Sequence, residues 1–161
     1  MPDEAADPRV SVTVSAPPAE AFRVFTEHPD EWLPPAHTFI REPESIAMEP
    51  WAGGRFYERG ADGTEATRGT IVEWAPTARL AVTWRVGAGW RPIDNDEHAS
   101  VIVAEFSPAG TDATEVTLTY KHLERHGEEM AKMIRAAVGA AGQGSTLERY
   151  AEAVARRVDR A

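Results

Sequence analysis

The stretch Met48–Tyr57, with the sequence MEPWAGGRFY, places the strongest constraint on how this chain folds. It ends one apolar segment at Pro50, turns on Gly53-Gly54 and restarts with the aromatic pair Phe56-Tyr57. Paired glycines supply backbone conformations that a residue with a Cβ atom adopts only at a cost. A second hairpin signal, Asp62-Gly63, follows within a few residues. The segment therefore predicts a tight bend that leads into a strongly curved antiparallel sheet.

Strand periodicity continues on both sides of this bend. Val10–Val14 alternates apolar and polar residues, and Thr114–His122 does the same with Val116, Leu118 and Tyr120 on one side. The strands predicted between them are Ser45–Glu49, Gly54–Arg59, Thr67–Trp74, Leu80–Val86 and Ser100–Phe106. The pattern is therefore one of many short antiparallel strands, with the loop 87–98 as the longest connection inside the sheet.

Helical periodicity is confined to the two ends of the chain. Pro17-Pro18 suits a helix start, and an apolar side built on Phe22 and Phe25 continues to His28-Pro29. Near the C-terminus, one helical face is predicted from Met130, Met133, Ile134, Ala137 and Val138. Ser145–Glu148 matches a capping box, and the apolar face that follows, from Leu147 to Val158, predicts a final helix of roughly four turns.

The element order, one strand, a helix, many strands and a long last helix, predicts an α+β fold. A curled sheet must bury its concave face, and the last helix is the element long enough to cover it. We expect a space between the two. Residues 9–161 are predicted to form a single domain, preceded by a disordered tail at residues 1–8.

Composition excludes several classes of function. The net charge of −9 argues against binding nucleic acid or an anionic membrane surface, which require clustered Lys and Arg. The chain has no cysteine, so it has neither disulfides nor thiolate chemistry. No apolar stretch is long enough for a membrane span, and the acidic start is unlike a signal peptide. We therefore expect a cytoplasmic protein that needs no cofactor.

Four segments resemble the SRPBCC, or START-like, superfamily, and in particular its branch of activator of heat-shock-protein-ninety ATPase-like bacterial proteins. These segments are VSAPPAEAF at 14–22, EPWAGGRFYE at 49–58, GTIVEWAPTARL at 69–80 and LERHG at 123–127. The resemblance implies a helix-grip fold, like that of birch-pollen-allergen-like proteins, with a cavity between the sheet and the last helix. Members of the superfamily include carriers of lipids and hormones, polyketide cyclases and regulators of chaperone ATPases.

Three polar patterns are weighed as sites and not favoured. His122 and His126 have metal-like spacing, but no third ligand is signalled, so no metal site is predicted. The oxygen-rich run Asp94–His98 lacks the ligand spacing of a calcium loop. The glycines at 139–144 follow a helical segment rather than a strand, which contradicts a phosphate-binding loop.

The aromatic residues give the leading hypothesis, which is a binding site for a small apolar or aromatic ligand in the cavity. The residues predicted to line it are Trp32, Phe56, Trp84, Trp90 and Tyr120. One alternative is a cyclase or hydratase that uses the same pocket, with Tyr120 and His122 as the acid or base on one strand face. Another is a chaperone-ATPase-regulating interaction module, which would need an exposed apolar patch on the convex sheet face. The oligomeric state is left open and includes a homodimer through a sheet edge.

Overall fold

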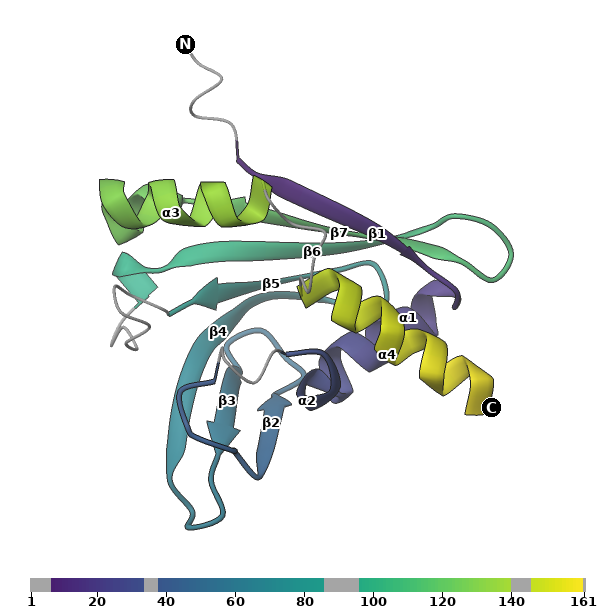
Figure 1. Cartoon of the computed structure of the whole chain (residues 1–161), viewed down its shortest axis with the longest axis horizontal. Helices are drawn as coiled ribbons and strands as arrows, with labels where there is room; N and C mark the ends of the chain where they lie inside the picture. The colour runs from purple at the N-terminus through teal and green to yellow at the C-terminus, as the bar shows by residue number, and fades with distance from the viewer. Residues whose placement is uncertain (1–6, 34–37, 86–95, 140–145, 161) are drawn as a thin grey trace.

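A computed structural model describes residues 7–33, 38–85, 96–139 and 146–160 (Figure 1). Several features predicted from the sequence lie outside these ranges. They are most of the N-terminal tail, Trp90 and most of the loop around it, Gly142, Gly144, and Ser145 of the capping box.

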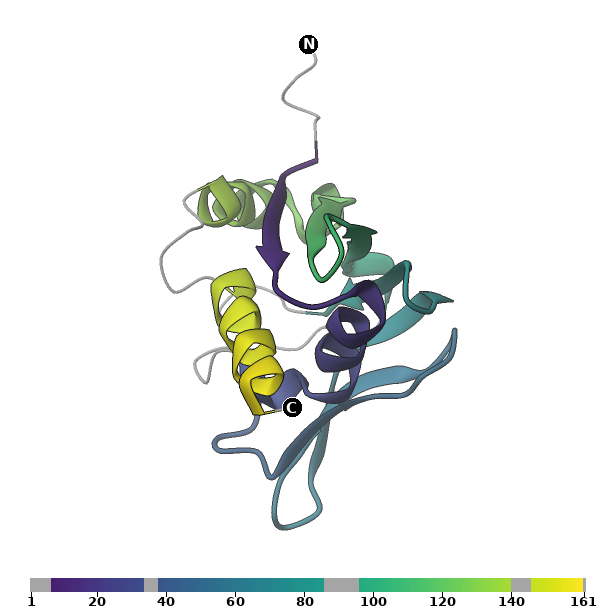
Figure 2. The same ribbon diagram turned by 90° about the vertical axis from the view of Figure 1, so that its right-hand side faces the viewer.

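Seven antiparallel strands form the sheet, in the order β1-β7-β6-β5-β4-β3-β2. Their bounds are β1 Arg9–Val14, β2 Ser45–Met48, β3 Arg55–Arg59, β4 Glu65–Ala75, β5 Arg79–Trp84, β6 Ser100–Pro108 and β7 Thr114–Lys121. Register shifts in β3 at Phe56/Tyr57 and in β4 between Ile71 and Glu73 add local twist. The sheet is strongly curled, with β2, β3 and the first part of β4 folded away from the other strands (Figures 1 and 2). The predicted α+β helix-grip fold is confirmed.

The predicted bend before β3 is built by its two glycines in different ways. Gly53 has a positive φ of 94°, which favours glycine. At Gly54, a Cβ atom would lie 2.7 Å from the Cβ of Glu49, so only a bare backbone fits against the preceding strand. Both residues are therefore required where β2 turns into β3.

Four α-helices and two short 3-10 turns accompany the sheet in the described part of the chain. The α-helices are α1 Pro18–Glu27, α2 Pro29–Trp32, α3 Glu128–Gly139 and α4 Thr146–Arg160, and the short 3-10 turn η5 spans Leu123–His126. The last helix confirms the predicted four turns. Two details differ from expectation: α2 forms one helical turn in the proline-rich stretch, and Met133 is 54% exposed rather than on the buried face of α3. A further 3-10 turn, η4, spans Asp96–His98.

The inner face of the sheet is buried in two parts. The main core joins inner-face residues such as Leu80 and Phe106 to α1, α2 and α4, whose Tyr150 and Val154 are fully buried. A second cluster lies at the other end of the sheet, where Leu123, Met130, Ala131 and Ile134 of η5 and α3 pack against Phe39, Trp84 and Tyr120. Coverage is thus divided between α4 and α3 rather than provided by one helix. Within the described ranges, no helix is long and apolar enough to cross a membrane.

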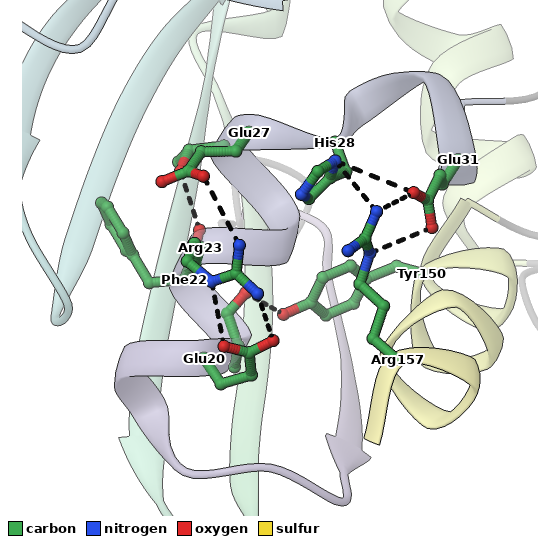
Figure 3. Close-up of polar contacts among 10 residues, drawn as sticks. Glu20, Phe22, Arg23, Glu27, His28, Glu31, Tyr150 and Arg157 are labelled. Atoms are coloured by element: carbon green, nitrogen blue, oxygen red, sulfur yellow. Dashed lines mark hydrogen bonds and ion pairs between the residues drawn. The ribbon is translucent and has the colours of Figure 1, made fainter. Parts of the chain in front are cut away.

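Polar contacts fix α4 onto α1 and α2 (Figure 3). The Tyr150 hydroxyl donates to the carbonyl of Ala21 at 2.6 Å. Arg157 donates to the Glu31 carboxylate and to Nδ1 of His28, which lies 3.1 Å away. These contacts join helices more than a hundred residues apart in the sequence, so they set the position of α4 over the core.

Candidate functional site

Aromatic side chains gather where β5 ends, β6 begins and β7 ends, beside η5 and the start of α3. Trp84 of β5 lies edge-on to Tyr120 of β7, with ring centroids 6.5 Å apart, and edge-on to His126 at 5.6 Å. Phe39 packs against the same cluster. All four side chains are only partly buried. We call Phe39, Trp84, Tyr120 and His126 the aromatic end of the inner face.

His126 is held by the strand opposite it. Its Nε2 lies 3.0 Å from the backbone nitrogen of Ser100 and 2.7 Å from the Ser100 hydroxyl. Ser100 is fully buried, and burial lowers the pKa of His126, so the imidazole is mainly neutral at pH 7. A neutral, positioned imidazole can donate or accept a proton at the aromatic end.

A buried ion pair connects Phe56 to this aromatic end. The Arg68 guanidinium lies 5.4 Å from the ring centroids of both Phe39 and Phe56 and pairs with the Glu58 carboxylate. Glu58 has no exposed surface, and it also accepts hydrogen bonds from the backbone nitrogens of Phe39 and Ile40. Burial lowers the pKa of Arg68, and the adjacent Glu58 carboxylate opposes that shift. The pair therefore anchors the segment that carries Phe39 against β3 and β4.

The five residues predicted to line the pocket have different surroundings. Trp84 and Tyr120 belong to the aromatic end, whereas Phe56 is buried in the main core. Trp32 lies in the main core, stacked on Phe25 at 4.6 Å, and its indole nitrogen donates to the carbonyl of Phe25. Trp90 lies outside the described residues. Ligand contact by any of the five stays a prediction.

The expected placement of His122 beside Tyr120 is wrong. It required β7 to stay regular, but β7 ends at Lys121 and His122 adopts the left-handed conformation, with φ 61°. Its side chain is 50% exposed and lies near Glu124. From the sequence, His126 was considered only as a metal ligand. In the structure it is His126 that packs on Trp84, the same ring that contacts Tyr120. A 3-10 turn directly after β7 brings His126 back beside the strand. Predicting that turn from the sequence would have identified His126.

A groove of about 630 Å³ lies elsewhere, between α1 and the ends of β2 and β4. Its apolar wall includes Phe22, Met48 and Trp74. Its polar side is the charged row on α1, where Arg23 pairs with Glu20 at 2.7 Å and with Glu27 at 3.6 Å (Figure 3). The size suits a small ligand. This groove does not lie beneath α4, where the sequence predicted a cavity.

Other expected features of the surface can also be located. On the outer face of the sheet, Arg79 pairs with Glu73 and Glu105, each at 2.9 Å. Arg55 pairs with Glu65 on the surface, at 3.0 Å. The large exposed apolar residues in the described part of the chain, Trp51, Val72, Met133 and Val158, belong to different segments. No group of three or more metal-ligating side chains occurs among the described residues.

Comparison with protein families gives one match over most of the chain. Residues 15–153 match the family described as Activator of Hsp90 ATPase homolog 1-like protein. None of the curated proteins matches the sequence.

Solved structures of similar fold include one with substantial sequence identity. An anthrahydroquino-γ-pyrone synthase, Txn09, complexed with SUM, is 40% identical, with 95% of this chain and 99% of that chain covered and a TM-score of 0.65. The self-sacrificing resistance protein CalC from Micromonospora echinospora is 26% identical, with 96% and 97% covered and a TM-score of 0.64. Protein NE0264 from Nitrosomonas europaea is 19% identical, with 98% and 99% covered and a TM-score of 0.64, and shows the fold alone.

Proposed function

Because the chain belongs to the family of Activator of Hsp90 ATPase homolog 1-like proteins, we propose that it binds a flat aromatic small molecule on the inner face of its sheet. The site is the aromatic end, where Trp84 and Tyr120 contact the ligand, and Phe56, also predicted from the sequence, lies in the main core next to Arg68. Trp32 and Trp90, also predicted from the sequence, would contribute only where the ligand extends toward the core or the loop after β5.

One observation carries this proposal: aromatic rings from four separate segments meet at the aromatic end and keep exposed surface there. A ring that is fully packed in a core has no apolar area left to offer a ligand, whereas Trp84, Tyr120 and Phe39 are half-buried. Burying further apolar area contributes roughly 25 cal/mol per Å² before ordering costs. Trp and Tyr also offer polar tips that orient a bound molecule. The likeness to Txn09, described as complexed with SUM, supports a ligand-binding role.

The groove beside α1 provides the competing location, and one pair of variants separates the two. Polycyclic aromatic compounds, anthraquinone among them, are titrated against the wild type, Trp84→Ala and Trp74→Ala, with binding followed by calorimetry. We expect Trp84→Ala to weaken binding at least tenfold and Trp74→Ala to leave it nearly unchanged. The reverse order would move the site to the groove. Absence of binding by the wild type would overturn the proposal.

Ring closure on a polyketide-like substrate is a second candidate function. It is favoured by the 40% identity, over nearly the whole chain, to a protein named as an anthrahydroquino-γ-pyrone synthase. In such a role, the Tyr120 hydroxyl and the neutral imidazole of His126 would be the proton-transfer groups at the aromatic end. Incubation with an open-chain aromatic precursor, followed by mass spectrometry and product chromatography, tests it. Turnover that persists in both Tyr120→Phe and His126→Ala would contradict these roles.

A further inference from the structure

The groove between α1 and the ends of β2 and β4 is a cavity that the proposed function does not use. Its volume, about 630 Å³, falls in the range of small-molecule sites. Buried Phe22 and Met48 form its floor, whereas Trp74 is half-buried and Pro50 is exposed at its rim. A ligand in the groove can therefore reach the apolar side chains that line it.

Helix α1 supplies the polar side of the groove from one of its faces. The lining residues of this helix are Ala19, Phe22, Arg23, Thr26 and Glu27, at the spacing of neighbours on a helix surface. Phe22 points away from α4 (Figure 3), so this face is separate from the one that α4 covers. The hydroxyl of Thr26 donates to the carbonyl of Phe22 at 2.9 Å. The side chains left to recognise a polar group of a ligand are therefore those of Arg23 and Glu27.

The charges along this face are unequal. Arg23 donates two hydrogen bonds to the Glu20 carboxylate, at 3.0 and 2.7 Å. Glu27 lies 3.6 Å from Arg23, which is longer than a hydrogen bond, and its side chain is 60% exposed. Two carboxylates thus share one guanidinium, and Glu27 keeps the capacity to accept hydrogen bonds from a ligand. The charge that complements this arrangement is a positive one.

Trp74 supplies a second feature that favours a cation. Its ring meets Phe22 edge-on, with centroids 5.2 Å apart, and it keeps exposed surface. The face of an aromatic ring carries negative potential, and among the aromatic side chains Trp attracts cations most strongly. An indole and a carboxylate that line the same groove suit a molecule combining an apolar body with a positive group.

We propose that this groove is a second ligand site, which binds small organic cations with an apolar or aromatic body and one protonated amine. The body packs on Trp74 and on the apolar floor, and the ammonium group donates to the Glu27 carboxylate. An anionic ligand is disfavoured, because the Arg23 guanidinium is already held by Glu20 and the charge of Glu27 would repel it. The site is independent of the aromatic end and selects ligands of a different charge.

The test uses three probes with one ring frame: 2-naphthylmethylamine, 2-naphthylmethanol and 2-naphthoate, which are cationic, neutral and anionic at pH 7. Each is titrated at low salt against the wild type, Glu27→Gln, Arg23→Gln and Glu124→Gln. NMR follows the α1 amides and the Trp indole N–H groups. Glu124→Gln is the matched control, because it removes the same charge from a side chain that is 75% exposed, in η5 at the other end of the sheet.

We expect the amine to bind the wild type roughly threefold more tightly than the alcohol, and the naphthoate to bind most weakly. Glu27→Gln should weaken amine binding about fivefold and leave alcohol binding unchanged. Arg23→Gln should strengthen amine binding, because it leaves both carboxylates without their guanidinium, and Glu124→Gln should change nothing. The three substituted side chains are 42% to 75% exposed, so each variant should fold.

The position of the shifted resonances locates the bound amine. Shifts in α1 and at the Trp74 indole support the inference, whereas shifts confined to Trp84 would place the amine at the aromatic end and overturn it. The inference also fails if the amine does not bind, if the anion binds best, or if Glu27→Gln and Glu124→Gln have equal effects. The aromatic end is tested separately, with neutral polycyclic compounds and Trp84→Ala, so either site can fail while the other stands.

Discussion

At the scale of single residues, the Glu58–Arg68 pair is the most demanding feature of the molecule. Both side chains are almost completely removed from water, at 0% and 4% exposure. A buried ion pair is tolerated when each partner is satisfied, and Glu58 is satisfied by Arg68 together with two backbone N–H groups. The pair therefore positions Phe39 at the aromatic end, because Glu58 accepts a hydrogen bond from the Phe39 backbone and Arg68 lies over its ring.

Removing the negative charge of Glu58 should strongly destabilise the folded state, because the positive charge of Arg68 would remain buried without a compensating carboxylate. We expect Glu58→Gln to lower the free energy of unfolding by about 3–5 kcal/mol, measured by urea denaturation. The matched control is Glu65→Gln, which removes a carboxylate from the exposed pairs with Arg55 and Arg59 and should cause no measurable loss. Equal effects of the two substitutions would contradict the argument.

Gly69 illustrates a constraint that comes from packing rather than from backbone conformation. A Cβ atom there would lie 1.9 Å from the carbonyl oxygen of Thr83 on the neighbouring strand β5. Because that oxygen belongs to the backbone, the clash can be relieved only by parting the strands. We expect Gly69→Ala to lower the free energy of unfolding by roughly 3 kcal/mol or more, measured by thermal and urea unfolding.

Gly63 provides the matched comparison for that substitution. It has a φ of 88°, and no atom lies within 4 Å of the position that a Cβ would take, so Gly63→Ala introduces backbone strain alone. A cost of about 1 kcal/mol is expected for it. If Gly63→Ala proved the more harmful of the two, the close approach of β4 and β5 would not be the limiting constraint.

At the scale of elements, α4 is attached to α2 by a contact that responds to pH. Hydrogen bonding from Arg157 holds the pKa of Glu31 below its ordinary value. A carboxyl whose pKa is lowered by folding stabilises the folded state above its unfolded-state pKa, about 4.3, and this stabilisation is lost as the pH falls through the lowered value. The attachment is therefore present at neutral pH and weakens in acid.

We expect Glu31→Gln to lower the free energy of unfolding at pH 7 by about 1–2 kcal/mol. The difference between the variant and the wild type should begin to shrink below the unfolded-state pKa and close only as the pH falls through the lowered folded-state pKa of Glu31, where the wild-type carboxyl also becomes neutral. Urea denaturation at a series of pH values measures this. Glu27→Gln on α1, which removes a mostly exposed carboxylate 3.6 Å from Arg23, serves as the control and should show no such dependence.

The elements also show which structure can be read from sequence. All seven strands were predicted to within about two residues, because alternation and turn residues are local signals. The single turn α2 was not predicted: Trp32 is buried by stacking on Phe25, and that contact depends on the tertiary fold. The same applies to the site. Trp84 and Tyr120 could be named from residue type, whereas the roles of Arg68, Glu58 and His126 depend on long-range contacts.

At the scale of the whole molecule, the division of the interior into two clusters implies unequal stability. The helix α4 contributes Tyr150, Ala153 and Val154, each fully buried in the main core. The helix α3 belongs to a smaller cluster, in which Met130, Ala131 and Ile134 meet half-buried rings. Segments with fewer buried apolar contacts open at a lower free energy than the global unfolding transition. We therefore expect α3 to open locally while the sheet and α4 stay folded.

Hydrogen exchange followed by mass spectrometry measures this directly. Amides of α3 should exchange faster than those of α4, and Ile134→Ala should speed exchange in α3 while leaving α4 protected. The matched substitution Val154→Ala should instead lower protection throughout, since it removes volume from the main core, at a cost of about 1–3 kcal/mol. Uniform exchange across both helices would contradict the division of the interior.

A ligand at the aromatic end should slow hydrogen exchange mainly in α3. Since α3 lies over Trp84 and Tyr120, a bound aromatic molecule adds the contacts that this helix lacks. At a ligand concentration of 100 times Kd, binding stabilises the folded state by about 2.7 kcal/mol. The slowing of exchange should be largest in α3 and absent in Trp84→Ala. A ligand that instead protected α1 and β2 would bind the groove lined by Phe22, Met48 and Trp74.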